Sequence, residues 1–274
     1  MSKPSAILMG SKPGSAVALE ILLQRGWEVK CAVASTQSVT PWLVGQDLSD
    51  SARTFGIKLI DQEKIPRDEK VDFVISYMFR RLVKRHLLET PRRAALNFHA
   101  APLPGFGGWA FYNVAIVEGV SEYGCTCHYM DEGFDSGPIL KVRRFPIDPR
   151  QETAYSLEQK AQAEMVRLFV DFCVLAETRE ELPLEKQDKE KVRYFTRRDF
   201  EELREIPSGA SEETIDRYAR AFFFPPYQCA QLRTNGTIVE VLPRLGKEQI
   251  AKRLHQCEKE RLLEIAREYS SQQA

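Results

Sequence analysis

Residues 6–34 of the chain read AILMGSKPGSAVALEILLQRGWEVKCAVA, and this stretch decides the fold. The apolar run Ala6–Met9 stops at a glycine, and apolar side chains then recur at helical spacing from Ser15 to Gly26. Val29–Ala34 follows as a second strand-like run. A buried strand, a helix and another buried strand in this order predict two parallel strands joined by a crossing helix.

The same alternation continues along the chain as far as Gly119. Short apolar runs recur at Phe73–Ile75 and Ala95–Phe98. Helices that would cross between the strands are expected at Leu43–Phe55, Arg80–Leu88 and Trp109–Glu118. We therefore predict an α/β fold with a Rossmann-like, mostly parallel sheet and helices on both of its faces.

The pattern changes beyond Gly119. Two expected strands, Tyr123–Met130 and Ile139–Phe145, flank a loop that contains glycines. Thr153–Glu177 has the apolar spacing of a long amphipathic helix. The charge-dense segment Thr178–Glu205 is typical, over most of its length, of a solvated linker.

The C-terminal part carries a hairpin signal. Asn235-Gly236 lies between strand-forming residues within Gln231–Leu242, which is typical of a two-residue type I′ turn. The end of the chain has the pattern of one charged helix, whose apolar stripe consists of Ile250, Leu254, Leu262 and Ile265. We predict a main domain over residues 1–180 and a small α+β appendage over residues 181–274, with this hairpin and helix.

The composition excludes several classes of protein. The chain has 274 residues, of which 43% are apolar, and this excludes a wholly disordered protein. Its 39 basic and 39 acidic residues balance, whereas a general nucleic-acid binder needs a basic surplus. No window approaches the roughly 20 apolar residues that a membrane helix needs. Among the cysteines only Cys125 and Cys127 lie close together, so we expect reduced packing thiols, no metal site and a cytoplasmic location.

Two polar side chains mark the end of one predicted strand. In Leu96-Asn97-Phe98-His99, Asn97 and His99 lie on the same side of the strand at its C-terminal end. Open α/β sheets bind their ligands at that end. A loop rich in proline and glycine, residues 101–108, follows at once. The residues alone leave a structural role for His99 open beside a catalytic one.

Two loops also have more than one interpretation. Residues 10–15, GSKPGS, lack the residue order of a phosphate-binding loop, so the alternatives are a structural turn and a helix N-terminus that faces an anion. Residues 131–137, DEGFDSG, lack the ligand alternation of a calcium loop. They are either an acidic turn or the source of a carboxylate that orients an imidazole.

A family resemblance rests on three quoted segments. Asn97-Phe98-His99, the Leu103-Pro104 step and residues 124–139, GCTCHYMDEGFDSGPI, resemble the formyltransferase family, which takes a formyl group from N10-formyltetrahydrofolate. The resemblance implies Asn97, His99 and Asp135 as catalytic residues. The Asn97 amide would donate to the developing oxyanion. His99 would accept the amine proton or donate to the oxyanion, and Asp135 would orient its ring.

The resemblance also implies two binding sites. The folate would lie beside the catalytic strand, held mainly through backbone groups. Its predicted contacts are Ser76, Tyr77, Met78, Phe79 and Leu82 on one wall and Asp131, Glu132 and Gly133 on the other. The predicted acceptor contacts are Lys12, Gly107, Trp109, Arg197 and Tyr227. The chain departs from the family at Ala100-Ala101, where relatives usually carry a different pair of residues.

The C-terminal residues are similar to those of nucleotide-sugar N-formyltransferases, from Tyr194 to Tyr227 in particular. This resemblance implies formyl transfer to the amino group of a nucleotide-linked deoxyamino sugar, in surface glycan biosynthesis, by a homodimer without a metal. The expected partners are small molecules, with neither nucleic acid nor membrane. The alternatives are a methionyl-tRNA formyltransferase and a formyltetrahydrofolate hydrolase, or, in another class, a non-catalytic folate- or nucleotide-binding module.

Overall fold

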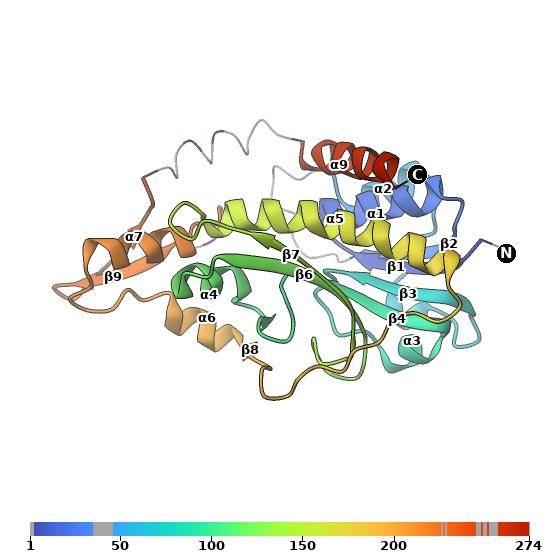
Figure 1. Cartoon of the computed structure of the whole chain (residues 1–274), viewed down its shortest axis with the longest axis horizontal. Helices are drawn as coiled ribbons and strands as arrows, with labels where there is room; N and C mark the ends of the chain where they lie inside the picture. Colours follow the sequence, from blue (N-terminus) through green and yellow to red (C-terminus); the bar gives the residue numbers. More distant parts are fainter. Residues whose placement is uncertain are drawn as a thin grey trace.

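One mixed sheet organises the chain in the computed structural model, which describes residues 3–34, 46–225, 227, 229–244, 248, 251 and 257–273. Six strands of this described part form the sheet in the order β2-β1-β3-β4-β6-β7 (Figure 1). Their bounds are Ser5–Gly10 (β1), Glu28–Ala34 (β2), Val71–Tyr77 (β3), Pro91–His99 (β4), Glu122–Tyr129 (β6) and Ile139–Pro146 (β7). The first four strands are parallel, whereas β6 and β7 pair antiparallel, so the predicted mostly parallel sheet is confirmed.

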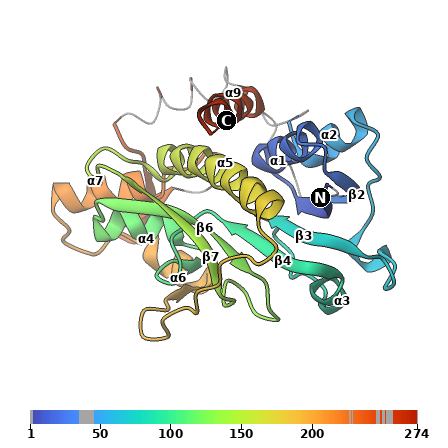
Figure 2. The same cartoon turned by 45° about the vertical axis from the view of Figure 1, so that its right-hand side comes forward.

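Three helices cover one face of the sheet, namely α1 (Pro13–Gln24), α2 (Leu48–Thr54) and α5 (Ala154–Thr178), and α9 (Glu258–Gln272) packs on the outer side of α1 and α5 (Figure 2). The strands supply alternate residues to this larger core, such as Leu8 of β1 and Phe98 of β4. The long helix α5 follows a capping box in which the Thr153 hydroxyl accepts from the Ser156 N–H, and this reciprocal pairing satisfies backbone donors at the helix start. The helix predicted at Thr153–Glu177 is confirmed.

The opposite face has a thinner cover. Ile7 and Met9 of β1 lie in a smaller core there, with Leu87 of the short helix α3 (Arg85–Glu89). The helix predicted over Arg80–Leu88 is wrong in its first half. The Gln62 amide donates to the Leu82 carbonyl and accepts from the Lys84 N–H, both at 3.2 Å, so it occupies backbone groups that a longer helix would use.

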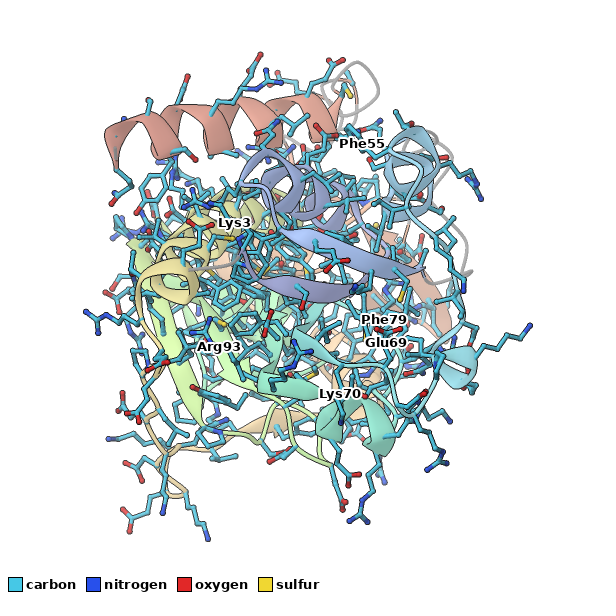
Figure 3. The ribbon with its side chains drawn as sticks, turned by 90° about the vertical axis from the view of Figure 1, so that its right-hand side faces the viewer. Lys3, Phe55, Glu69, Lys70, Phe79 and Arg93 are labelled. Atoms are coloured by element: carbon cyan, nitrogen blue, oxygen red, sulfur yellow. The ribbon has the colours of Figure 1, made fainter. Side chains whose placement is uncertain are left out.

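Arg93 of β4 ties the sheet to the end of α5 (Figure 3). Its guanidinium donates to the Ala176 carbonyl at 2.6 Å and to the carbonyls of Arg179 and Glu180, which lie at or just beyond the helix end. A cationic side chain is favoured at a helix C-terminus, where carbonyl groups lack partners. This contact fixes where the chain leaves α5.

The chain then forms small elements: β8 (Tyr194–Phe195), α6 (Arg197–Leu203), α7 (Glu212–Ala221), β9 (Ala230–Thr234) and β10 (Thr237–Val241). The hairpin turn has positive φ at Asn235 and Gly236, as a type I′ turn requires, and the prediction is confirmed. Of the predicted terminal stripe, Leu262 is buried and Ile265 packs beside it, whereas Ile250 and Leu254 lie outside the described residues. So do residues 43–45 of the helix predicted from Leu43. The domain boundary at residue 180 stays a prediction.

Candidate active site

Three neighbouring strands present polar side chains on the face of the sheet that carries the smaller core. Strand pairing places Ser76 of β3 beside Asn97 of β4, and Asn97 opposite His128 of β6. The Ser76 hydroxyl donates to Asn97 Oδ1 at 2.7 Å, and Asn97 Nδ2 lies 3.0 Å from His128 Nε2. The alternation of side chains along each strand therefore aligns three polar groups in one row.

The hydrogen bonds around this row assign its protons. His128 Nδ1 lies 2.8 Å from the carbonyl oxygen of Tyr129, which can only accept, so Nδ1 carries a proton. In the neutral ring Nε2 is then the acceptor for one N–H of Asn97. Because Ser76 occupies Asn97 Oδ1, the second Asn97 N–H is the donor that this row offers to a bound molecule.

His99 lies at the end of β4 and is 7% exposed. Its Nε2 atom lies 2.8 Å from the carbonyl oxygen of Phe106 and must donate to it. Its Nδ1 atom lies 3.5 Å from Oδ1 of Asp135, and the ring edge packs against Phe111. The base atom of a neutral His99 is therefore Nδ1.

Asp135 completes the cluster from the loop between β6 and β7. Its Oδ2 accepts from the Gly108 N–H at 3.0 Å, and its Oδ1 lies 3.7 Å from His128 Nε2. Burial alone would raise the pKa of this carboxyl, but the positive charge of the His99 and His128 imidazoles in their protonated forms, together with the Gly108 N–H, holds that pKa well below its usual range. Asp135 is therefore an anion at neutral pH.

The loop that carries Gly108 is held from both sides. The Thr126 hydroxyl accepts from the Leu103 N–H at 3.0 Å and donates to the Ala101 carbonyl at 2.8 Å. Gly108 has φ +88°, and a Cβ there would lie 2.1 Å from the Phe195 carbonyl oxygen. Glycine is thus required at 108, because strand β5 (Gly107–Gly108) pairs closely with β8.

The residues predicted to bind folate differ in their burial and in their contacts. Ser76 lies in the polar row, but the Tyr77 ring is fully buried against Phe98 in the larger core, so only its backbone can face a ligand. Met78 has φ +52°, Phe79 packs against the smaller core, and the Leu82 side chain is 46% exposed (Figure 3).

The opposite wall of the predicted folate site is a tight turn. Asp131 Oδ1 accepts from the Gly133 N–H at 3.0 Å and from the Ser136 hydroxyl at 2.6 Å. Glu132 is exposed and forms an ion pair at 3.4 Å with Arg85 of α3. Asp131 therefore shapes the loop that presents Asp135, and this structural use leaves its role toward a ligand a prediction.

The predicted acceptor residues divide into separate groups. Gly107 lies beside Asp135, and Trp109 comes directly after Gly108 with 63% of its surface exposed. Lys12 forms an ion pair with Glu158 of α5. Two of the predicted residues contact Phe224: Lys12 Nζ lies 5.8 Å from its ring centroid, and the Tyr227 ring 5.6 Å. Arg197 is the exposed first residue of α6.

Sequence reasoning missed two residues of this region. His128 belongs to the quoted segment but received no role, although its position two residues from Thr126 on a strand indicates a shared face. Gln187 was assigned to a solvated linker, yet its Nε2 donates to the carbonyls of Asp135 and Gly137. Nothing in the charge pattern around Gln187 signals this contact.

A family profile described as Formyl transferase matches residues 50–172. The matched span contains Asn97, His99 and Asp135 together. This part of the chain is therefore similar to the formyl transferase family.

Proteins of known activity resemble the matched residues and the segments around them. GDP-perosamine N-formyltransferase of Brucella melitensis is 33% identical over 184 residues, which cover 62% of this chain and 64% of that protein. Methionyl-tRNA formyltransferase of Lysinibacillus sphaericus is 32% identical over 157 residues, or 53% and 50% of the two chains. The chain thus spans less than two thirds of either relative.

The fold of this chain is similar to that of a sugar 3N-formyl transferase, whose structure was solved in the presence of dTDP and 5-N-formyl-THF. The TM-score is 0.72 at 21% identity, over 86% of this chain and 85% of that one. Within the described ranges, no helix has the length and apolar character to span a membrane. The same part of the chain holds no group of His, Cys, Asp and Glu suited to a metal ion.

Proposed function

We propose that this protein is an N-formyltransferase that moves a formyl group from N10-formyltetrahydrofolate to the amino group of a nucleotide-linked deoxyamino sugar. One observation carries the proposal. A free amide N–H of Asn97, the Nδ1 atom of His99 and the carboxylate of Asp135 belong to one cluster, linked through His128. This set contains an oxyanion donor, a base and a fixed anion, which acyl transfer to an amine requires.

The reaction uses these groups in turn. The amine nitrogen attacks the formyl carbon, a C–N bond forms, and negative charge develops on the formyl oxygen. The second N–H of Asn97 donates to that oxygen, and a single donor of this kind contributes about 3–4 kcal/mol. The bond from the formyl carbon to N10 of the folate then breaks, and N10 takes up a proton.

His99 is the proposed acceptor for the amine proton. Its Nε2–H is committed to the Phe106 carbonyl, so the proton goes to Nδ1. The resulting imidazolium lies beside the Asp135 carboxylate, 3.5 Å away, and this anion favours the charged ring. The separation exceeds a normal hydrogen bond, so Asp135 lies near Nδ1 without a short hydrogen bond to it.

The formyl donor is a second substrate, and the segment after β3 suits it. The Tyr77 ring is fully buried, so the backbone of this segment is what lies at the strand end beside Asn97. The Met78 N–H already donates to the Phe98 carbonyl at 3.2 Å. The Met78 φ of +52° turns the chain there. The related structure determined with 5-N-formyl-THF supports a formylated folate as the donor.

Two observations favour a nucleotide sugar as the acceptor: the share of each relative that the chain matches, and the net charge of the chain. The GDP-perosamine N-formyltransferase match covers 64% of that protein, whereas the methionyl-tRNA formyltransferase match covers 50% of that protein. The chain has a formal net charge of zero, and tRNA binding would be served by a basic surface. Trp109 offers an exposed aromatic face beside Gly108 for the acceptor.

We further propose that the protein acts in the cytoplasm, in surface glycan biosynthesis, as a homodimer. The support for a dimer is the hairpin β9–β10, whose Ile238 and Val239 point to opposite faces and are both exposed, as is Leu242 next to it. Exposed apolar residues on a two-stranded sheet favour pairing with another surface.

The test is an acceptor-dependent assay. Purified protein is mixed with N10-formyltetrahydrofolate, and release of tetrahydrofolate is followed with dTDP-, UDP- or GDP-linked amino sugars, with methionyl-tRNA, or with no acceptor. Turnover that requires an amino sugar supports the proposal. Turnover only with methionyl-tRNA supports the alternative acceptor, and turnover with no amine indicates a hydrolase; either result would overturn the proposed function.

A further inference from the structure

The segment that follows α5 binds the candidate active site at two places. We call residues 183–195 the strap. At its start, Glu185 and Ile139 exchange two backbone hydrogen bonds of 2.7 and 2.8 Å, directly after the loop that holds Asp135. At its end, the carbonyl of Arg193 accepts from the Gly107 N–H at 3.0 Å, and β8 pairs with β5. The strap therefore joins the two loops that meet at the Asp135 carboxylate.

Between these two attachments, one side chain turns inward. Gln187 is half-buried, whereas its neighbours Lys186 and Asp188 are exposed. The Gln187 Nε2 atom donates to the carbonyl of Asp135 at 2.8 Å and to the carbonyl of Gly137 at 2.7 Å. Both hydrogens of the amide are used, one for each carbonyl, so the side chain clamps the backbone on either side of Ser136.

The backbone of the clamped loop is strained at Asp135. Asp135 has φ +55°, a left-handed conformation that costs a non-glycine residue free energy. Such a conformation persists only where the surrounding structure enforces it. Gly137 lies so close to β6 that a Cβ would meet the Tyr129 carbonyl oxygen at 1.9 Å, so only glycine fits at the exit of the loop. The carbonyl that Gln187 binds belongs to the strained residue itself.

We propose that Gln187 is a positioning residue that holds the Asp135 carboxylate against Gly108 and His99. This inference rests on the proposed formyl transfer, since it assigns a residue to the same site. Without the amide, Asp135 can relax toward negative φ, and its carboxylate then leaves the Gly108 N–H, now 3.0 Å from Oδ2. Misplacement of a catalytic group by about 1 Å can lower a rate about 100-fold.

The variants separate the amide donor from general effects on the strap. Gln187→Glu keeps the shape but sets an acceptor against two carbonyls, and Gln187→Ala removes the contact. Lys189→Gln is the matched control, because it makes the same change of charge as Gln187→Glu at an exposed position two residues away. We expect both Gln187 variants to lower kcat by about 10- to 100-fold with KM for both substrates within about threefold, and the control to keep wild-type kcat.

A double variant tests whether Gln187 acts through Asp135. In an Asp135→Asn background, measured under single turnover with excess enzyme, Gln187→Ala should lower the rate by no more than about twofold, because the group that it positions is gone. If Gln187→Ala lowers the rate in the Asp135→Asn background by the same factor as in the wild type, the proposal is overturned. An unchanged kcat in Gln187→Ala, with an active wild type, would also overturn it.

A readout without turnover separates this inference from the proposed function. Hydrogen–deuterium exchange of the peptide that spans residues 131–137 should rise in Gln187→Ala and stay at the wild-type level in Lys189→Gln, with the melting temperature of both variants near that of the wild type. Faster exchange in Gln187→Ala than in the wild type, together with a wild type that transfers no formyl group, would retain the clamp and refute only the proposed function. Unchanged exchange in Gln187→Ala would refute the clamp.

Discussion

The two nitrogen atoms of the His99 ring face opposite partners, and the Nδ1 atom lies 3.5 Å from Oδ1 of Asp135. Because Nε2 donates to a backbone carbonyl, rotation of the ring by half a turn would place Cε1 against that carbonyl and Cδ2 toward Asp135, so both contacts would be lost. The ring therefore has one orientation that satisfies both atoms. That orientation fixes which nitrogen can take a proton from a substrate.

Replacing His99 with asparagine should abolish turnover and leave folate affinity within about threefold, because the base is lost while the backbone contacts of the folate segment remain. Turnover and folate binding are measured separately, the second by calorimetry. His86, on the helix α3, supplies the control variant His86→Asn, which should keep full activity. Wild-type turnover in His99→Asn would end the enzyme proposal for this site.

Replacing Asn97 with aspartate should lower kcat by about 100- to 1,000-fold, because the side chain keeps its size but loses its N–H donors. KM should change little, since the lost donor acts on charge that develops in the transition state. Steady-state kinetics check this split. A rise in KM at constant kcat would show instead that Asn97 contributes to ground-state binding.

Two glycines with positive φ form a matched pair for testing the β5–β8 contact. Gly108 and Gly119 have φ of +88° and +68°, but only at Gly108 would a Cβ meet the Phe195 carbonyl oxygen, whereas it would contact nothing within 4 Å at Gly119. Both alanine variants carry a backbone cost of about 1–2 kcal/mol. Gly108→Ala alone should also lower kcat at least about tenfold, because the N–H that binds Asp135 moves. Equal kcat in the two variants would contradict this.

The depressed pKa of Asp135 predicts how stability depends on pH. Its folded-state pKa lies below the unfolded value of about 3.9, so the carboxylate contributes stability that is fully present above that value and is lost as pH falls through the folded-state pKa. In urea unfolding, the stability gap between wild type and Asp135→Asn should narrow as pH falls below about pH 4. A gap that does not vary with pH would show that Asp135 is uncharged or unpaired.

The proposed homodimer predicts that charge on the hairpin separates the subunits. Ile238→Glu together with Val239→Lys places a charge on each exposed face of β10 without altering the net charge, and light scattering should then report a monomer. Circular dichroism verifies that the variant is folded. A wild-type protein that is already monomeric at working concentration would refute the dimer.

Sequence patterns were sufficient for those parts of the fold that local rules determine. The parallel unit follows from alternating apolar runs, and the hairpin follows from Asn235-Gly236, because few residues tolerate its positive φ angles. Strand alternation placed Asn97 and His99 on one face. The assignment of Asp135, in contrast, came only from a family resemblance, since an acidic turn carries no sign of what it will face.

Other contacts could not be predicted because they depend on pairing between distant segments. His128 faces Asn97 only because β6 runs antiparallel to β4 in one register, and a shift by one residue would turn its side chain to the other face. The strap is held by backbone groups at Glu185 and Arg193, so its exposed charged side chains look like those of a free linker. The short α3 begins only at Arg85 because of Gln62, from another part of the chain.

The pairing of β5 with β8 has a consequence for anyone who designs a shortened chain. A fragment that stops at the end of α5 would include Asn97, His99 and Asp135, yet it would lack the Gln187 amide and the backbone partner of Gly107 and Gly108. Phe195 is the last residue of that pairing. A minimal expression fragment should therefore extend past this phenylalanine, however well a shorter one folds.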